Sequence, residues 1–400
     1  MTTATQLEQD YGTQNYKPLP VVLSRGRGCE VWDTEGRRYL DFMSAYSAVS
    51  HGHAHPRLLQ VLNEQAARLA VVSRAFHSDR LGPFLERACT MTGMDRPLPM
   101  NTGVEVVEAG LKLARRWAYR VKGVPADQAE IIACRGNFHG RTLGAIAMSD
   151  EAEYRRDFGP FPPGFELVDY GDSDALEAAI SERTAAFLVE PIQGEGGIVV
   201  PPPGYLSRCA EICRRHNLLL IADEIQTGLG RTGKLLACDH EQVRPDLLLL
   251  GKALGGGLYP VSLLLGHAEI LELFGPGSHG STFGGNPLAA SIGLAALDIL
   301  EDEGLIENSR LMGKYLSQGL EALAHPGICE VRGRGLMIGM ELDPSRLAGR
   351  AVSEALMASG MLVRETHATV LRFAPPLIVR REQIDELLGV LPDVLEQVGV

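Results

Sequence analysis

Short apolar runs recur along the middle of this chain and alternate with segments of helix length. The runs occupy residues 131–134, 186–189, 218–222, 247–250 and 261–265, and the intervening segments include 175–180 and 205–216. An apolar run of this length, bounded by turn residues, is typical of a buried strand. Strands that alternate with helices predict an α/β fold, in which a mostly parallel sheet is covered by helices.

The two ends of the chain have a different pattern, in which short strands and helices are mixed. Near the start we expect a hairpin over 27–41 and a helix opened by Pro56, and a helix over 287–303 closes the middle region. After residue 310 the pattern predicts a helix, a strand over 334–342, a helix over 350–359, a strand over 370–373 and a last helix from residue 382. Such a mixture predicts a second, smaller α+β domain.

The chain has 400 residues, of which 45% are hydrophobic, so it is long enough to form a large core. Its formal net charge is −12 at pH 7 and it has no basic run, which argues against nucleic acid or an anionic membrane as a partner. No apolar stretch approaches the length of a membrane span. The seven cysteines are scattered without a CxxC pair, and residues 1–10 lack a signal-peptide core. We therefore expect reduced thiols and a cytoplasmic location.

Lys252 stands at the end of one of the predicted buried strands. The run 247–250 and Gly251 precede it, and glycines at 255–257 follow. Ligands of open α/β sheets bind at the carboxyl edge of the strands. Desolvation at such an edge lowers the pKa of a lysine and makes its amine nucleophilic. From this run alone, a surface lysine at a strand end remains the alternative.

Asp223 ends a second apolar run, 218–222. A buried carboxylate needs a partner, because an isolated charge in apolar surroundings is costly. A lysine and an aspartate at the ends of separate strands suit a pyridoxal phosphate site. The lysine amine can bond to the aldehyde of the cofactor, and the aspartate can keep the pyridine nitrogen protonated. A structural ion pair between the two residues is the alternative.

Two further segments fit the same kind of site. Residues 101–104 precede a helical apolar stripe, and Gly103 would allow an anion to approach the free N–H groups of the helix start. Residues 136–142 place Phe138 between glycines, where it could stack on a flat ring, with Arg141 nearby for a carboxylate. An ordinary capped helix and an ordinary loop are the alternatives.

Taken together and in this order, the segments resemble the class III, or subgroup II, aminotransferases of fold type I, and within them the ornithine δ-aminotransferases. The resemblance covers nearly the whole chain, and its most specific stretches are 15–20, 44–49, 190–195, 222–228, 250–254 and 279–287. It implies a large domain over 61–305 that binds pyridoxal phosphate. It also implies a small domain built from an N-terminal segment, 1–60, and a C-terminal segment, 306–400.

The resemblance also implies a set of cofactor-binding residues. Lys252 would carry the cofactor and move the proton, Asp223 would pair with the pyridine nitrogen, and Thr282 would reach the cofactor phosphate of the neighbouring subunit in a homodimer. Of the rest, Gln226 would bond the phenolic oxygen, Phe138 and Ile225 would cover the two ring faces, and Gly103 and Val104 would bind the phosphate. The complete set is Gly103, Val104, Phe138, Asp223, Ile225, Gln226, Lys252, Ser281 and Thr282.

The substrate-binding residues implied by the resemblance are Tyr16, Tyr46, Arg141, Glu195 and Arg372. Tyr16 and Arg141 would hold the α-carboxylate of L-ornithine, and Tyr46 would shape its pocket. Arg372 would receive the α-carboxylate of glutamate. Glu195 would pair with Arg372 while ornithine is bound and release it for glutamate.

The activity that follows is transfer of the δ-amino group of L-ornithine to 2-oxoglutarate. The products would be glutamate and glutamate 5-semialdehyde, which cyclises to pyrroline-5-carboxylate. The alternatives are a class III ω-aminotransferase for acetylornithine or 4-aminobutyrate, an amino-acid racemase of the same fold, and a binding protein without activity. The bulk of Tyr16 favours unmodified ornithine over an acetylated one.

Some stretches depart from the family pattern or suggest other chemistry. Residues 106–110, just after the predicted phosphate-binding residues, replace the small residues and threonine that are usual in the family. Gly196 stands where alanine is typical. Residues 228–233 fit the GxGxxG pattern of dinucleotide sites but do not open a helix directly after the strand. Histidines alternate over 51–55, but no cysteine or carboxylate cluster completes a metal site. We expect no metal and no dinucleotide.

Overall fold

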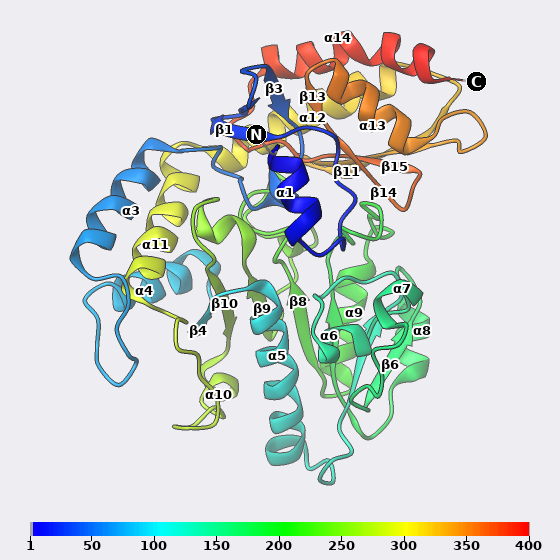
Figure 1. Cartoon of the computed structure of the whole chain (residues 1–400). Coiled ribbons are helices and arrows are strands. Elements are labelled where there is room, and N and C mark those ends of the chain that lie inside the picture. Colours follow the sequence, from blue (N-terminus) through cyan, green and yellow to red (C-terminus); the bar gives the residue numbers. More distant parts are fainter. Residues whose placement is uncertain (1–2, 400) are drawn as a thin grey trace.

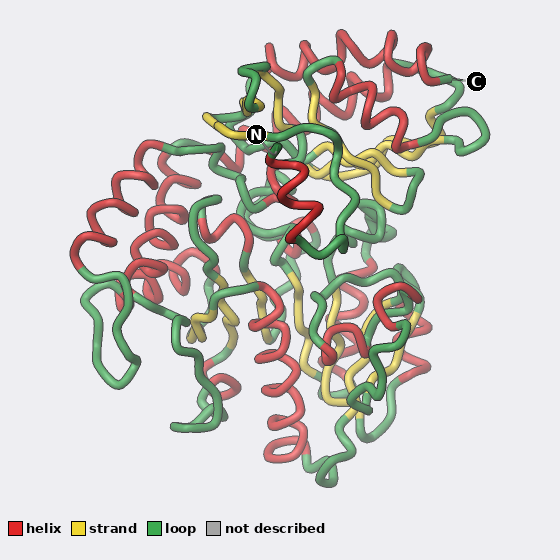
Figure 2. The backbone as a smooth tube through the Cα atoms, in the orientation of Figure 1, coloured by secondary structure: helices red, strands yellow, loops and turns green. Residues whose placement is uncertain are grey.

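The structure, a computed structural model, describes residues 3–399 and has a large lower part and a smaller upper part (Figure 1). The lower part is a sheet with helices around it, and Figure 2 shows its strands enclosed by helices. The upper part combines two small sheets with helices from the end of the chain. Within residues 3–399, no helix has both the length and the apolar composition needed to cross a membrane.

The central sheet has seven strands in the order β4-β10-β9-β8-β7-β5-β6. Their bounds are β4 Arg96–Met100, β5 Glu130–Cys134, β6 Phe165–Val168, β7 Thr184–Val189, β8 Leu219–Asp223, β9 Leu247–Leu250 and β10 Ser262–Gly266. Strands β6, β5, β7, β8 and β9 are parallel, whereas β10 is antiparallel to both β9 and β4. The predicted mostly parallel sheet is therefore confirmed.

Both faces of this sheet are buried, which explains why its strands read as continuous apolar runs. On one face, Ile221 and Leu249 pack with helix α5 (Gly103–Trp117). On the other face, Leu220 and Leu248 belong to a core shared with α9 (Tyr205–Arg215) and α11 (Pro287–Asp302). Each fully buried leucine contributes roughly 1.5–3 kcal/mol.

Two strands of the sheet were not predicted, and they form its two edges. Strand β4 contains Pro97 and Pro99, which have no N–H to donate to a neighbouring strand. Strand β4 pairs only with β10, so the N–H groups on its other side have no strand to bond. An edge strand tolerates proline for this reason. Strand β6 is short and pairs only with β5 at the opposite edge.

The upper part contains two four-stranded sheets. The first has β1 (Leu23–Arg27), β2 (Glu30–Asp33), β3 (Arg38–Asp41) and β13 (Met361–Leu362), and the second has β11 (Ile328–Arg334), β12 (Met337–Leu342), β15 (Val370–Phe373) and β14 (Arg364–Thr366). Because β13 pairs in parallel with β3, the two ends of the chain share one sheet. The boundary expected after residue 60 falls inside α3 (Pro56–Arg68), and the one expected after residue 305 falls at the start of α12 (Leu305–Ala322).

The strand predicted over 334–342 is wrong in part, because the chain reverses there. Strand β11 ends at Arg334 and β12 begins at Met337, and the two form an antiparallel hairpin. Gly335 takes the turn at φ +54°, and a Cβ at this position would lie 2.4 Å from the backbone carbon of Thr232. A side chain would therefore not fit, and glycine allows the tight turn.

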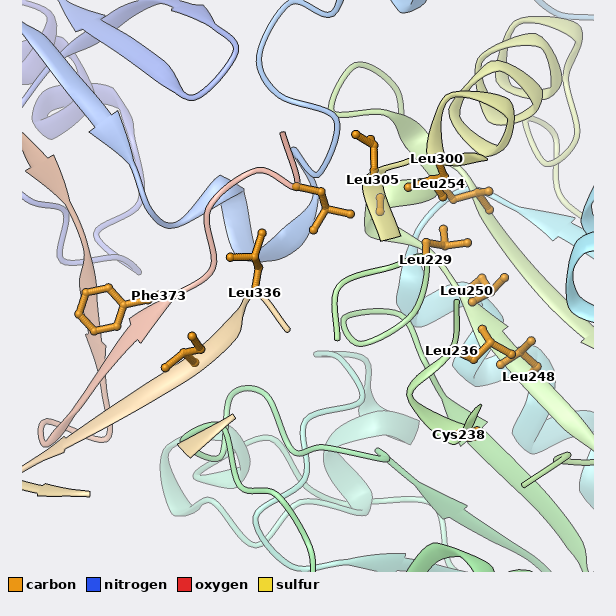
Figure 3. Close-up of a cluster of buried hydrophobic side chains, with 14 of the residues drawn as sticks. Leu229, Leu236, Cys238, Leu248, Leu250, Leu254, Leu300, Leu305, Leu336 and Phe373 are labelled. Atoms are coloured by element: carbon orange, nitrogen blue, oxygen red, sulfur yellow. The ribbon is translucent and has the colours of Figure 1, made fainter. Parts of the chain in front are cut away.

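The other helices are α1 Ala4–Tyr11, α2 Ser44–Ser47, α4 Leu81–Thr92, α6 Leu143–Ala147, α7 Ala152–Arg155, α8 Ser173–Ala179, α10 Ala268–Leu271, α13 Gly349–Ala358 and α14 Arg381–Val398. A hydrophobic core runs from the sheet into the upper part (Figure 3). Leu248 and Leu250 of β9 lie at one end of this cluster, Leu336 and Phe373 lie at the other, and Leu229 lies between them.

Candidate active site

A cavity of about 210 Å³ opens where β8 and β9 end. Its lining contains most of the residues expected to hold a cofactor. The lining residues are Gly103, Val104, Phe138, His139, Gly140, Glu190, Glu195, Asp223, Ile225, Gln226 and Lys252. The carboxyl edge of the sheet therefore gathers these side chains, as ligand sites of open α/β sheets do.

Lys252 enters this cavity from a strained turn. Strand β9 ends at Leu250, Gly251 follows, and Lys252 opens a 3₁₀ turn, Lys252–Gly255, with φ +43°. A positive φ is uncommon for a residue other than glycine and costs on the order of 1–3 kcal/mol, so the surrounding structure must impose it. Burial lowers the pKa of Lys252, although the carboxylates of Glu195 and Asp223 act in the opposite direction. A lower pKa raises the fraction of neutral, nucleophilic amine.

The hydrogen-bonded partner of Asp223 is His139, a residue for which the sequence indicated no role. His139 Nδ1 donates to Asp223 Oδ2 at 2.7 Å, and the N–H of Ile225 donates to Oδ1 at 3.1 Å. Burial alone would lower the pKa of His139, but the adjacent Asp223 carboxylate outweighs it and raises the pKa. The raised pKa of His139 favours a protonated imidazole beside the Asp223 carboxyl, and a carboxyl so placed can pair with a pyridinium nitrogen.

The start of helix α5 forms an anion-binding site at one side of the cavity. Glu105 accepts hydrogen bonds from the N–H groups of Thr102 at 2.6 Å and Asn101 at 3.0 Å, which fixes the chain before the helix. The first N–H groups of the helix, on Gly103 and Val104, have no partner within it and point toward its N-terminal end. A Cβ on Gly103 would lie 3.1 Å from the side chain of Ile225, so glycine makes room there for Ile225.

Glu190, in the stretch 190–195, has a buried carboxyl group for which the sequence indicated no role. Its Oε1 accepts the N–H of Phe138 at 2.9 Å, and its Oε2 accepts the N–H of Gly194 at 3.1 Å. Burial raises the pKa of Glu190 to about 7. One side chain thus joins the loop that carries Phe138 to the loop that carries Glu195.

Glu195 and Arg372 form an ion pair beside the cavity. Arg372 Nη1 lies 2.6 Å from Glu195 Oε1, and the two side chains are 8% and 24% exposed. Burial would raise the pKa of Glu195, but the charges of Arg372 and Lys252 outweigh it and lower the pKa, so the carboxylate is anionic. The Arg372 guanidinium also lies 5.0 Å from the centre of the Tyr46 ring.

Tyr46 is held in a left-handed turn, Ser44–Ser47, in which φ is 41°, 46°, 59° and 74° in order. Left-handed turns cost L-residues roughly 1–2 kcal/mol each. Arg231, which is fully buried, supports the turn by donating to Ser44 Oγ at 3.3 Å and Ser50 Oγ at 2.9 Å. Arg231 comes from the glycine-rich stretch 228–233, so in this protein that stretch braces the Tyr46 turn.

The remaining predicted residues lie outside the lining of this cavity. The Arg141 guanidinium stacks 3.6 Å from the centre of the Tyr154 ring, and Tyr16 is 72% exposed. Ser281 Oγ accepts from Asn101 Nδ2 at 2.9 Å, whereas Thr282 is exposed. Among residues 3–399 no cluster of His, Cys, Asp and Glu could hold a metal ion.

The geometry defines an α/β enzyme with a buried lysine and a buried aspartate at the edge of the sheet, next to an anion-binding site. Residues 11–395 match the family model of the class-III aminotransferases. An ornithine aminotransferase of Exiguobacterium is 54% identical over 395 residues, which are 99% of this chain and 98% of that protein.

Solved structures agree with this match. An ornithine aminotransferase of Toxoplasma gondii, with partial occupancy of PLP at its active site, has a TM-score of 0.97 and 45% identity, covering 99% of this chain and 95% of that one. The acetylornithine aminotransferase of Elizabethkingia anophelis has a TM-score of 0.89 and 43% identity, covering 98% of both chains. The chain belongs to the class-III aminotransferase family.

Proposed function

We propose that this protein transfers the δ-amino group of L-ornithine to 2-oxoglutarate with pyridoxal phosphate as its cofactor. The observation that carries the proposal is the Glu195–Arg372 ion pair beside Lys252. In this pair, Arg372 can receive a substrate carboxylate but is masked by the protein's own carboxylate, that of Glu195. The names of the Exiguobacterium and Toxoplasma relatives support the same substrate.

The residues of the cavity fit pyridoxal phosphate. The N–H groups at the start of α5 suit its phosphate, Asp223 suits its pyridine nitrogen, and Phe138 and Ile225 suit its two ring faces. Gln226 would bond its phenolic oxygen, and Lys252 would hold its aldehyde carbon. When bound, the cofactor supplies an electron sink that makes a proton next to the reacting amine acidic.

The amino acids must bind in opposite directions, because ornithine reacts through its distal amine and glutamate through its α-amine. Tyr16 and Arg141 would hold the α-carboxylate of ornithine far from Lys252, while Glu195 keeps Arg372 masked. Lys252 Nζ would then take the proton from the carbon that bears the reacting amine and, within the same half-reaction, pass it to the cofactor carbon that keeps the amine nitrogen. When glutamate binds, its α-carboxylate would replace Glu195 on Arg372.

This replacement is energetically feasible because one charge-assisted contact is exchanged for another. Removing one partner of a buried ion pair without replacement costs about 3–5 kcal/mol. A substrate that brings no carboxylate to Arg372 would therefore leave the pair closed. The ion pair thus favours binding of ornithine with its δ-amine toward Lys252, and it admits glutamate with its α-amine toward Lys252.

We also propose a homodimer in which Thr282 serves the cofactor of the neighbouring subunit. Thr282 is exposed and does not line the cavity of its own chain, although it neighbours Ser281, which contacts the start of α5. Exposed aromatic side chains, Phe76 at 68% and Phe283 at 50%, offer apolar contact area for a second copy. All seven cysteines are unpaired, which favours the reducing cytoplasm.

The proposal is tested by the formation of pyrroline-5-carboxylate from L-ornithine, with and without 2-oxoglutarate. We expect turnover only with both substrates, at a higher kcat/KM for ornithine than for N-acetylornithine or 4-aminobutyrate. A higher kcat/KM for N-acetylornithine would transfer the assignment to that substrate. Inversion of an amino acid in the absence of an oxo acid would instead indicate a racemase. Loss of activity on dilution to monomers, restored by concentration, would support the shared site.

A further inference from the structure

The segment that carries Glu195 is a short loop, residues 194–198, which we call the gate loop. Its base is closed by two backbone hydrogen bonds between Gln193 and Val199, at 3.1 and 2.9 Å. Gly194 donates its N–H to Glu190 at 3.1 Å, so the base of the loop is anchored to the residue that directly follows strand β7 of the central sheet. From the same side, Gln226 Nε2 donates to the carboxylate of Glu195 at 3.4 Å.

The backbone carbonyls of the tip are held by the upper part of the molecule. Arg332 on β11 donates from Nη2 to Gly197 O at 2.8 Å, and from Nε to Gly197 O at 3.1 Å and Ile198 O at 3.2 Å. Thr366 on β14 donates from Oγ1 to Glu195 O at 2.9 Å. The gate loop therefore connects the central sheet to the second small sheet.

Arg332 is fixed in the orientation that these contacts require. Its Nη1 lies 2.8 Å from Glu330, its Nη2 lies 2.7 Å from Glu341, and its side chain is only 17% exposed. A guanidinium has a rigid fork of donors and can serve two carbonyls and two carboxylates at once. A lysine ammonium is a single point and cannot reproduce that fork.

The conformation of the gate loop shows that it needs to be held. Ile198 has φ +53°, which is an outlier for a β-branched residue and persists only where the surroundings over-determine it. Its side chain is 3% exposed and packs with Ile192 and Met337. A Cβ on Gly339 of β12 would lie 3.0 Å from Ile198 Cβ, so this glycine lets the strand approach the loop closely.

We propose that Arg332 and Thr366 are positioning residues for the gate. By holding the carbonyls of the gate loop, they place the carboxylate of Glu195 against Arg372 and set how completely Arg372 is masked. The consequence is that the upper part of the molecule sets the preference between ornithine and glutamate. This inference rests on the proposed function, since it assigns a specificity role within the same site.

Two variants test the inference on the holoenzyme. Arg332→Lys keeps the charge but removes the fork, and Thr366→Val removes one donor at nearly constant volume. Glu330→Gln is the matched control, because it alters an exposed partner of Arg332 and leaves the carbonyl contacts in place. The equilibrium probe is glutarate, a dicarboxylate without an amine, whose binding requires an unmasked Arg372. The kinetic probe is the ratio of single-turnover rates with ornithine and with glutamate.

We expect glutarate to bind about tenfold more tightly to Arg332→Lys and about threefold more tightly to Thr366→Val, as loss of charged and neutral hydrogen bonds implies. The ornithine-to-glutamate rate ratio should fall by similar factors, while Glu330→Gln and the cofactor content stay at the wild-type level. Unchanged glutarate affinity in both variants would overturn the inference. A wild-type protein that does not react with ornithine would overturn the proposed function instead, and the glutarate measurement would still decide the positioning role. If Arg332→Lys does not fold, Thr366→Val carries the test alone.

Discussion

Replacing Gly110 by alanine should stabilise the protein, although the residue is buried in the middle of helix α5. A Cβ at this position would meet Leu249 Cδ2 at 3.5 Å, Ile221 Cγ2 at 3.9 Å and Leu264 Cδ1 at 4.0 Å. All three are ordinary van der Waals distances to side chains of the central sheet. The added methyl group therefore fills space without displacing a neighbour.

The expected gain has two parts. Alanine is more favourable than glycine in a helix interior by about 1 kcal/mol. Burial of one more methyl group contributes roughly 0.8 kcal/mol. Together these terms predict a gain of about 1–2 kcal/mol in the free energy of unfolding, or a rise of roughly 2 °C in the thermal midpoint for a chain of this size.

Gly293 in helix α11 is a matched control, because it is also buried and helical. There a Cβ would lie 2.6 and 2.7 Å from the ring of Phe84, which is itself fully buried. Gly293→Ala should therefore destabilise the protein by about 1–3 kcal/mol through overpacking. Thermal and denaturant unfolding of the cofactor-free protein would measure both variants. A loss of stability in Gly110→Ala would refute the argument, and a loss of cofactor affinity would show that the start of α5 depends on a flexible glycine.

The other predictions concern the chemistry. Lys252→Ala should fold but lose covalent attachment of the cofactor, and its half-reactions should slow by roughly 10²–10⁴-fold. Near-normal rates would exclude Lys252 as the catalytic lysine, and an unchanged far-UV circular dichroism spectrum is the control for folding. Glu195→Gln should leave Arg372 unmasked, so that the ratio of ornithine to glutamate rates falls by roughly 10–100-fold, and an unchanged ratio would contradict the gate. For Glu190, the folded-state pKa of about 7 lies above its ordinary value of 4.5, so the stability that its protonated form contributes is present below pH 4.5 and is lost as pH rises through 7. The free energy of unfolding of the cofactor-free wild type, relative to Glu190→Gln, should therefore fall by about 3 kcal/mol between about pH 5 and 8, and a flat difference would contradict a neutral buried carboxyl.

The parts of the fold that could be predicted from the sequence are those buried on both sides. Strands β7, β8 and β9 are covered by helices on both faces, so every residue along them is buried and all but the first residue of β7 and the last residue of β8 are apolar. Strand β4 carries two prolines and lies at an edge, where composition no longer indicates a strand. The hairpin at Gly335 was missed because the predicted strand, 334–342, contained β12 but only the last residue of β11, a strand with no fully buried residue.

The candidate site shows a similar division. Lys252 and Asp223 could be located because each ends an apolar run, and the position of a strand end is a local property of the sequence. Asp223 has the buried partner that its own burial requires, but this partner, His139, is 84 residues away in the sequence. Only the fold brings them to 2.7 Å. Arg231 was assigned to no function for the same reason, since its acceptors come from three distant segments of the chain.

In the proposed gate, the contacts around Glu195 would make the choice between two substrates depend on the position of its carboxylate rather than on the strength of the ion pair. An ion pair that was too stable would exclude the α-carboxylate of glutamate, and one that was too weak would let ornithine bind head-first. The carboxylate of glutamate would restore the contact that Arg372 loses with Glu195. The state in which Arg372 pairs with Glu195 and the state in which it pairs with glutamate would therefore differ little in energy. Small displacements of Glu195 then decide which state is populated, since about 1.4 kcal/mol changes the ratio tenfold. In our proposal, a loop whose carbonyls are fixed by Arg332 and Thr366, and whose strained Ile198 is held by packing, would control displacement on that scale.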